Sequence, residues 1–281
     1  MTDDTDLPPL DPTSFARSYG PCALVAGGAN GIGAAYSRQL ADLGLDLVVL
    51  DRDADALESL RRELLARPGA AEVTTAVVDL AQPASGLLAA VRAAVGEREI
   101  GLLVANAAWS PVGPFLDTDL DALLTAIDVN CRATVVLTHE LGRAMANRGR
   151  GGIIVMSSIA AETGTAQVAL YSATKAFDLV LAEGLWYELR DKGVDVVAIR
   201  PGSTRTPGWE STQPPGSDLD AAMAPADVAA DAIRALGVTP STAAGRSNRA
   251  AVSMFRGMER RDVIELMSGI TASLVPPPDV S

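Results

Sequence analysis

Residues 22–53, CALVAGGANGIGAAYSRQLADLGLDLVVLDRD, carry the pattern that decides the fold. A short apolar run is followed by a glycine-rich turn, a segment with helical periodicity and a second short apolar run. Short, continuous apolar runs are typical of parallel strands, because helices cover both faces of a parallel sheet. The stretch therefore predicts a β-α-β unit with the glycine turn between its first strand and its helix.

The same alternation continues along the chain. Four later segments are predicted to be strands: VTTAVVDL, IGLLVANAA, IIVMSSIAA and VDVVAIRPG. Helical patterns separate them, the longest over about 117–148 and about 168–192. Because strands that alternate with helices form parallel sheets, we expect an α/β fold with a single doubly wound parallel sheet and helices on both faces.

Both ends of the chain and one internal segment depart from this alternation. Residues 1–19 are acidic and proline-rich, which predicts a flexible tail before an α/β domain over 20–250. Residues 203–224 are rich in Gly, Pro and Ser, and a long irregular segment within a compact domain predicts a substrate lid. Residues 251–281 predict a helical C-terminal extension with a disordered end, PPPDVS.

The composition limits the classes of partner. Hydrophobic residues make up 48% of the 281 residues and charged residues 21%, as in globular proteins. The net charge of −12 disfavours nucleic acid, because phosphate binding requires clustered Lys and Arg. One histidine, His139, and two distant cysteines predict neither a metal site nor a disulfide. Without a signal-peptide pattern or an apolar run of about 20 residues, the sequence predicts a cytoplasmic protein with no membrane span.

The glycine turn predicts a site for a dinucleotide. Gly27, Gly31 and Gly33 lie between the first strand and its helix, where free N–H groups and the helix dipole favour a pyrophosphate. Asp51 ends the second strand, 18 residues after Gly33, where a carboxylate can bind ribose hydroxyls. A carboxylate repels a 2′-phosphate whereas the neighbouring Arg52 attracts one, so NAD is favoured and NADP is the alternative.

Polar residues follow several of the predicted strands. Asn106 follows the fourth strand, Ser158 ends the fifth and Tyr171 begins the next helix, so all three are expected in one crevice at the carboxyl edge of the sheet. Lys175 lies four positions after Tyr171 and thus on the same helical face. An adjacent ammonium stabilises a phenolate, which lets a tyrosine exchange a proton with a substrate oxygen. By itself the pair could be two ordinary residues on one helix face.

Several spaced motifs change that balance, because together they resemble those of the short-chain dehydrogenase/reductase family over roughly 20–250. The matching motifs are AGGANGIG (26–33) for TGxxxGxG, ANAA (105–108) for NNAG, Asn130 in DVN, Ser158 in MSSIA, YSATK (171–175) for YxxxK, and PGSTRT (201–206) for PG. Ser158 lies thirteen positions before Tyr171, the spacing usual in the family. Ala26, Ala105 and Ala108 depart from the family pattern and affect support of the cofactor site rather than a reacting group.

The resemblance implies a role for each matched residue. Tyr171 would be the general acid/base, Lys175 would lower its pKa and bind the nicotinamide ribose, Ser158 would bind the substrate oxygen, and Asn130 would anchor a proton-relaying water. Thr206 would contact the carboxamide, and Asp79 would meet the adenine edge unless it only caps a helix. The residues implied for the cofactor are Gly27, Asn30, Gly31, Ile32, Gly33, Asp51, Arg52, Asp79, Leu80, Asn106, Ala107, Tyr171, Lys175, Pro201, Gly202, Thr204 and Thr206.

The resemblance also implies a Rossmann-type catalytic domain and an NAD(P)-dependent oxidoreductase that interconverts a secondary alcohol and a ketone. Two alternatives stay open: epimerase-type transient oxidation at the same site, and a dinucleotide-binding protein without turnover. Trp209, Met223 and apolar residues after 250 could line a lid over a lipophilic substrate or serve core packing. Family members commonly pair through the helices that correspond to 117–148 and 168–192, so a homodimer or homotetramer is expected.

Overall fold

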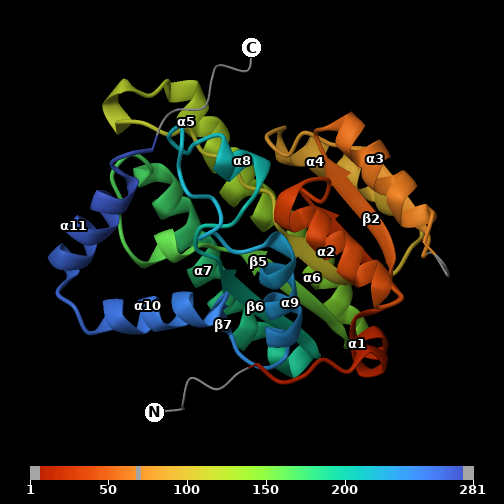
Figure 1. Cartoon of the computed structure of the whole chain (residues 1–281). Coiled ribbons are helices and arrows are strands. Elements are labelled where there is room, and N and C mark those ends of the chain that lie inside the picture. The colour runs from red at the N-terminus through yellow and green to blue at the C-terminus, as the bar shows by residue number, and fades with distance from the viewer. Residues whose placement is uncertain (1–6, 68–70, 275–281) are drawn as a thin grey trace.

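The computed structural model describes residues 7–67 and 71–274 of the chain. Residues 1–6 of the predicted tail and residues 275–281 of the predicted disordered end lie outside the described residues. A seven-stranded sheet with the order β3-β2-β1-β4-β5-β6-β7 forms the centre of the molecule (Figure 1). The strands are β1 (Cys22–Ala26), β2 (Asp46–Asp51), β3 (Val73–Val77), β4 (Ile100–Ala105), β5 (Gly151–Met156), β6 (Val194–Arg200) and β7 (Ser241–Ala243).

Every neighbouring pair of strands is parallel, which confirms the predicted fold class. The six strands expected from the sequence are present, and β7 is an additional edge strand that pairs with the end of β6. β1 pairs with β2 on one side and with β4 on the other. The order of the strands therefore reverses between β1 and β4, where doubly wound sheets bind their ligands.

Alternate residues of each strand point to opposite faces of the sheet, and each face has its own core. Ala23 and Val25 of β1 belong to the core under α1 (Pro12–Tyr19), α2 (Gly31–Asp42), α3 (Ala54–Leu65) and α9 (Pro225–Ala235). Cys22 and Leu24 belong to the core under α4 (Ala84–Val95), α6 (Ala133–Arg148) and α7 (Ala169–Leu189). Helices thus cover both faces, as expected for buried parallel strands (Figure 1).

The prediction of a flexible tail is wrong for residues 12–19, which form α1. Asp11 caps this helix by accepting a hydrogen bond from the Thr13 N–H, and Phe15 and Tyr19 are buried. The Tyr19 hydroxyl donates to Asp195 Oδ2 at 2.8 Å. The acidic, proline-rich composition therefore does not predict this helix. Its two aromatic side chains are buried by residues that lie far away in the chain.

The predicted lid is a loop whose two ends are joined to each other. Thr204 and Met223 form an isolated parallel bridge, and the Arg205 N–H donates to the Met223 carbonyl at 2.9 Å. Between these ends lies the short helix α8 (Pro207–Glu210). The loop is therefore anchored at its base, while its function as a lid stays a prediction.

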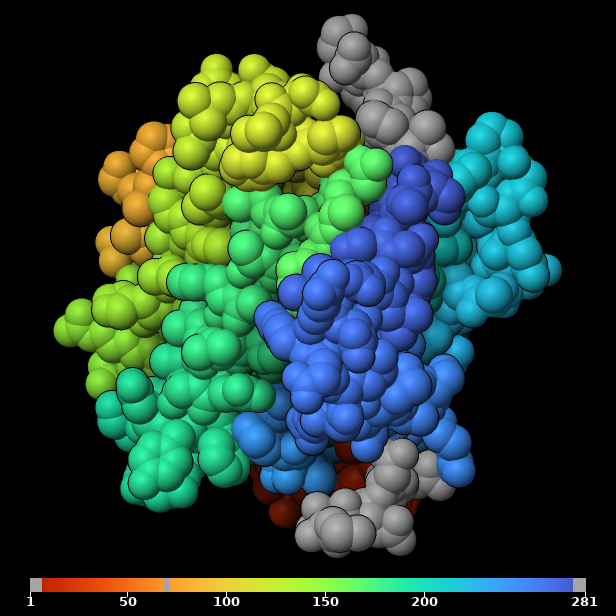
Figure 2. Space-filling view, turned by 90° about the vertical axis from the view of Figure 1, so that its left-hand side faces the viewer, coloured from red at the N-terminus to blue at the C-terminus, as the bar shows by residue number. Residues whose placement is uncertain are grey.

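The C-terminal extension consists of α10 (Arg246–Arg256) and α11 (Arg260–Thr271). Figure 2 shows these blue helices lying across one face of the molecule, between α7 (green) and the loop that contains α8 (cyan). Ser268 Oγ of α11 accepts a hydrogen bond from the Ala166 N–H, and Thr271 Oγ1 donates to the Ala166 carbonyl. The extension is thus tied to the segment that leads into α7. Among the described residues, no helix is both apolar and long enough to span a bilayer.

Candidate active site

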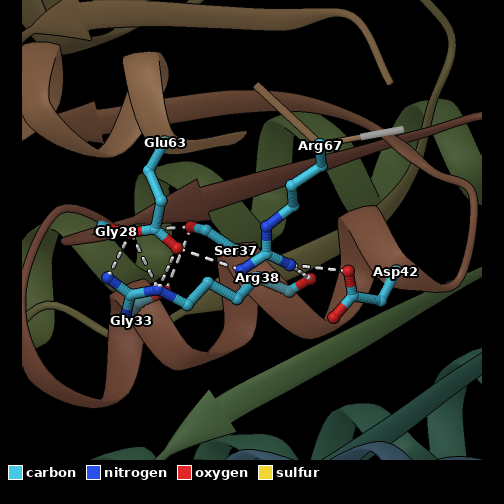
Figure 3. A network of polar contacts seen from close by, with 7 residues as sticks. All are labelled: Gly28, Gly33, Ser37, Arg38, Asp42, Glu63 and Arg67. Atoms are coloured by element: carbon cyan, nitrogen blue, oxygen red, sulfur yellow. Dashed lines mark hydrogen bonds and ion pairs between the residues drawn. The ribbon is translucent and has the colours of Figure 1, made fainter. Parts of the chain in front are cut away.

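The glycine turn after β1 is held by backbone contacts that exclude side chains. The N–H groups of Gly27 and Gly28 donate to the Leu50 carbonyl at 2.7 and 3.2 Å, and Gly27 has a φ of 71°. A Cβ at Gly33 would lie 1.8 Å from the Gly27 carbonyl oxygen. The Ser37 hydroxyl contacts the carbonyls of Gly28 and Gly33 at 3.2 and 3.1 Å (Figure 3). The first turn of α2 is thereby packed against the glycine loop.

The start of α2 offers N–H groups to a ligand. Its N-cap residue, Asn30, makes no capping side-chain hydrogen bond within the described chain and instead contacts Asp53 at 3.3 Å. The first turn of the helix carries no acidic residue. Gly31, Ile32 and Gly33 therefore present uncapped N–H groups at the positive end of a helix dipole, an environment that suits a phosphate.

The outer side of α2 is joined to α3 by a surface ion network. Arg38 Nη2 lies 2.8 Å from Glu63 Oε2, and Arg67 binds both Glu63 and Asp42 (Figure 3). The Arg38 hydrogen bond outweighs other effects and lowers the pKa of Glu63 to about 2. Exposed ion pairs contribute little to stability, typically about 0–1 kcal/mol each. Their contribution is to orient α2 and α3, which flank the end of β2.

Asp51 lies at the carboxyl end of β2, half-buried beside the glycine turn. Its Oδ2 accepts a hydrogen bond from the Ala29 N–H at 3.0 Å, and its Oδ1 accepts one from the Asp53 N–H at 3.2 Å. These bonds hold the carboxylate at the rim of the turn. Arg52 beside it is exposed.

Asp79 and Leu80 follow β3 at the same edge of the sheet. Asp79 is exposed, and its Oδ1 accepts a hydrogen bond from the Ala81 N–H at 2.9 Å. The N-cap of α4 is Pro83, so Asp79 shapes the turn before that helix rather than capping it. Leu80 is 7% exposed and packs in the core under α4.

Asn106 joins the end of β4 to the glycine turn. Its side-chain amide donates to the Gly27 carbonyl at 2.7 Å, and the N–H groups of Asn106 and Ala107 donate to the Ala26 carbonyl at 3.2 and 2.9 Å. Ala26 has no hydroxyl that could link the two segments, and the Asn106 amide makes the link between them.

The segment after β6 reaches the glycine turn from the other side. A Cβ at Gly31 would lie 2.8 Å from Thr206 Cγ2, so Thr206 stands directly over the start of α2. The Thr206 hydroxyl accepts a hydrogen bond from the Trp209 N–H at 3.2 Å and thereby caps α8. Thr204 donates to the Gly202 carbonyl at 3.0 Å.

Pro201 contacts the residue predicted to bind the substrate oxygen. The Ser158 hydroxyl accepts a hydrogen bond from the Ala160 N–H at 3.1 Å and lies 3.5 Å from the Pro201 carbonyl. The Ile159 N–H donates to that same carbonyl at 3.0 Å. The end of β5 and the end of β6 are thus joined where the predicted substrate site begins.

Tyr171 and Lys175 lie on one face of α7, as their spacing predicts. Lys175 Nζ is 5.9 Å from the centre of the Tyr171 ring. Tyr171 is half-buried, whereas the Lys175 side chain is 2% exposed. Nζ donates to the Met156 carbonyl at 2.7 Å, and the Ser157 hydroxyl donates to the Lys175 carbonyl at 2.7 Å. The lysine therefore joins α7 to the end of β5.

Asn130 is fully buried and interrupts the long helix predicted over 117–148. That region consists of α5 (Leu120–Ile127), one π-helical turn (Asp128–Arg132) and α6. Asn130 Oδ1 accepts from the Trp109 N–H at 2.8 Å, and Nδ2 donates to the Trp109 carbonyl and to Thr174 Oγ1. The π turn aims this amide at both the loop after β4 and Thr174 of α7.

The family model for short chain dehydrogenase matches residues 21–215, which contain the glycine turn, Ser158, Tyr171 and Lys175. This match covers more than half of the chain. The chain belongs to the short-chain dehydrogenase/reductase family.

Individual relatives agree with this membership. A 7beta-hydroxysteroid dehydrogenase of Clostridium sardiniense is 30% identical over 89% of this chain and 95% of its own length. A solved structure described as giving insights into 7beta-hydroxysteroid dehydrogenase stereoselectivity has a TM-score of 0.83, with 27% identity over 91% of this chain and 99% of its own. A short-chain dehydrogenase from Sphingobium yanoikuyae in complex with NADPH has a TM-score of 0.71, with 25% identity over 93% and 99%.

Several other relatives are longer than this chain. The match covers 56% of one fungal relative and 64% of one mouse relative. Most of the relatives are named as dehydrogenases or reductases, and two are named as inactive hydroxysteroid dehydrogenase-like proteins. This chain is an oxidoreductase of the family that acts on CH–OH groups.

The structure places the predicted residues of this short-chain dehydrogenase at one edge of the sheet and adds a residue that the sequence analysis missed. Asp178 is 1% exposed and its Oδ2 lies 2.9 Å from Lys175 Nζ. Its position three residues after Lys175 was a usable signal, because residues three apart share a helix face. The surrounding residues of α7 are largely apolar, so the helix does not stand out as polar at this position.

Proposed function

We propose that this enzyme interconverts a secondary alcohol and a ketone by hydride transfer with NAD(H) or NADP(H). The observation that supports this most directly is the position of the buried Lys175 ammonium, 5.9 Å from the Tyr171 ring at the carboxyl edge of the sheet. A positive charge is thereby placed beside Tyr171. Tyr171 then serves as the general acid/base.

The glycine turn suits a dinucleotide. Side chains are excluded at Gly31 and Gly33, the start of α2 has uncapped N–H groups, and Asp51 stands at the rim where ribose hydroxyls would lie. A dinucleotide bound there would supply the hydride acceptor for oxidation of the carbinol carbon and the hydride donor for reduction of the carbonyl carbon. Gly31, Ile32 and Gly33 would hold the pyrophosphate, and Thr206 would lie beside the nicotinamide end.

The remaining chemistry belongs to the chain. During oxidation, the Tyr171 phenolate accepts the proton of the substrate hydroxyl, and during reduction the phenol returns it to the carbonyl oxygen. Ser158 donates a hydrogen bond to that oxygen and fixes its position. Two N–H groups of Lys175 bind Met156 and Asp178, which leaves the third for the cofactor ribose.

NAD is the favoured cofactor because the Asp51 carboxylate would repel a 2′-phosphate. The exposed Arg52 and the structural neighbour that holds NADPH support NADP as the alternative. Asp51 is fixed by two backbone N–H groups, so it cannot turn away from a phosphate without losing them.

A lipophilic substrate is supported by apolar side chains at the start of α7. Pro111, Phe115, Leu123, Val168 and Leu170 gather there with Thr118 around a hollow of water size, and Leu170 directly precedes Tyr171. Gln167, which also lines it, has a φ of 66°, a strained backbone conformation for a residue with a side chain. The hydroxysteroid dehydrogenases among the relatives act on substrates of comparable character, which their names state.

The function is tested by a screen at the absorbance band of reduced nicotinamide. NAD and NADP would each be paired with secondary alcohols, and their reduced forms with ketones, including steroids and smaller compounds. Turnover that requires Tyr171 supports the proposal. Exchange of stereochemistry without net NADH formation would instead favour epimerase chemistry, and cofactor binding without any turnover would favour a binding protein.

We further propose that the enzyme is a cytoplasmic homodimer or homotetramer that associates through α5, α6 and α7. These helices expose Leu120, Leu124, Val135, Val180 and Tyr187 by 42–68%. Large apolar side chains gathered on adjacent helices favour association with a second copy. Light scattering should show an oligomer whose mass falls to that of the monomer in Val180→Asp; a monomeric wild-type chain would contradict the proposal.

Fractionation of the cell in which the chain is expressed tests the proposed cytoplasmic compartment.

A further inference from the structure

The catalytic helix carries a buried ion pair that the proposed reaction does not by itself require. Lys175 Nζ and Asp178 Oδ2 are 2.9 Å apart, with side-chain exposures of 2% and 1%. Both residues lie on the face of α7 that packs toward the sheet, and they are three positions apart. The lysine has its proposed partner in Tyr171, whereas the aspartate touches neither the hollow nor the glycine turn.

Burying this carboxylate has a large energetic cost. An ion removed from water loses several kcal/mol of solvation, and only well-placed partners offset that loss. Thr134 lies beside the carboxyl, but its hydroxyl donates to the Asn130 carbonyl at 2.7 Å. Within the described chain, Oδ1 of Asp178 has no hydrogen-bond partner. The charge of Asp178 is therefore compensated mainly by Lys175.

An apolar residue would pack at this position without that cost. The neighbours of Asp178 along the same side of α7 include Ala182 and Leu185, which belong to the core under α6 and α7. Replacing a buried ion pair with apolar residues of similar volume is often neutral or stabilising. Packing alone therefore does not account for an aspartate, and its effect on Lys175 does.

The effect of Asp178 on Lys175 is electrostatic, and other groups that face the pair contribute to the same pKa values. Burial lowers the pKa of Lys175, but the charge of Asp178 offsets burial, Tyr171 adds to its effect, and the pKa lies above its usual value. Burial raises the pKa of Asp178 above its usual value, and Lys175 and the Thr134 hydroxyl act in the opposite direction. Cys131, on the π turn, faces both residues; burial raises the pKa of its thiol to about 11, so the thiol is neutral near pH 7.

We propose that Asp178 is a positioning residue that keeps the buried Lys175 ammonium charged and holds it beside Tyr171. The carboxylate and the Met156 carbonyl bind two of the three N–H groups of Lys175. The statement about charge stands on the ion pair alone. Its consequence for turnover rests on the proposed function.

The charge of Lys175 can be measured without turnover, because the chain has only two lysines, Lys175 and Lys192. Biosynthetic labelling with [13Cε]lysine gives two NMR signals, which Lys192→Arg assigns, and each signal shifts when its amine loses a proton. Wild-type Lys175 should remain charged well above neutral pH. In Asp178→Asn, which keeps the shape and removes the charge, the midpoint should fall by about one pH unit or more.

Glu188→Gln is the matched control, since Glu188 lies on the same helix, is exposed and loses the same charge. Its Lys175 midpoint should equal that of the wild type. A Lys175 midpoint that is unchanged in Asp178→Asn, or a wild-type Lys175 that is neutral at neutral pH, would overturn the proposal. Asp178→Ser provides a second neutral variant if Asp178→Asn does not fold, and the wild-type titration tests by itself whether Lys175 is charged.

The pH profile of turnover tests the link to the reaction. If the Lys175 charge supports Tyr171, the alkaline limb of kcat/KM should move to lower pH in Asp178→Asn by the same amount as the NMR midpoint, and Glu188→Gln should leave it in place. A shifted midpoint with an unmoved limb would show that the reaction does not use this charge. If the wild type turns over no substrate, the proposed function fails, while the NMR titration still decides the role of Asp178.

Discussion

The cofactor side and the substrate side of this enzyme are built in different ways. Around the glycine turn, carbonyls and N–H groups of distant strands interlock, and a single Cβ at Gly33 would collide with the backbone. The loop over 203–224 is joined to itself at its base, by the bridge between Thr204 and Met223, and Thr206 lies over the start of α2. The proposed cofactor contacts lie on the interlocked side, and the proposed substrate selection lies with a loop and with helices at the surface. Four substitutions test how far this contrast extends.

The largest effect is expected at Tyr171, where the two sides meet. Tyr171→Phe removes the hydroxyl that exchanges the proton, so turnover should fall by about 10²–10⁴-fold. Binding of the dinucleotide, measured by fluorescence titration, should stay within a few-fold of wild type because the ring remains. Tyr187→Phe removes the hydroxyl of an exposed tyrosine on the same helix and should leave turnover unchanged. Undiminished turnover in Tyr171→Phe would refute the acid/base assignment.

The next effect is expected on the interlocked side. In Gly33→Ala, the new Cβ must push α2 away from Gly27, and overpacking of this kind costs about 1–3 kcal/mol. Cofactor affinity, measured by calorimetry, should fall by at least about tenfold because the N–H groups of α2 move away from the pyrophosphate.

The control for this substitution is Gly269→Ala on α11, where an added Cβ meets nothing within 4 Å. It should leave cofactor affinity unchanged and raise the free energy of unfolding by about 0.5–1 kcal/mol, as alanine favours a helix over glycine. Equal cofactor affinities in Gly33→Ala and the wild type would show that the turn is less constrained than its contacts indicate.

A smaller and more selective change is expected at the rim of the turn. Asp51→Ala removes a charged acceptor, and hydrogen bonds to charged groups contribute about 1.5–3 kcal/mol, so NAD affinity should fall by roughly tenfold or more. NADP affinity should fall less or rise. Arg52→Ala provides the reciprocal test, since it should weaken NADP and spare NAD. The ribose assignment does not survive if Asp51→Ala weakens both cofactors to the same degree.

The smallest effect is expected on the substrate side. Trp209 is half-buried on α8, and Trp209→Ala should raise KM for a lipophilic ketone by roughly three- to tenfold, equivalent to about 1 kcal/mol of apolar contact, with kcat unchanged. Leu65→Ala, which changes an exposed leucine on α3, should leave both constants unaltered. A reduced kcat in Trp209→Ala would place the loop in the reaction rather than over the substrate.

The same contrast explains what the sequence could predict. The strands, the glycine turn and the Tyr171–Lys175 pair follow from short-range patterns, and all of them are present in the structure. β7 has three residues, of which two are Ser and Thr, so no apolar run announces it. Helix α1 depends on Asp195, a partner far away in the chain. Asp178 lies within an otherwise largely apolar helix. The roles of the site residues stay predictions that the substitutions above address.

Helix α1 has a practical consequence for anyone who shortens this chain. The Tyr19 ring lies where a Cβ at Gly152 would be 2.8 Å from it, and the Tyr19 carbonyl lies 2.4 Å from where a Cβ at Gly101 would be. Gly101 of β4 and Gly152 of β5 thus leave space that Tyr19 fills. A chain that begins at Gly20 would contain every motif of the family and yet carry a void under its central strands. The matched family region begins at residue 21. Removal of the residues before it would therefore remove part of the core.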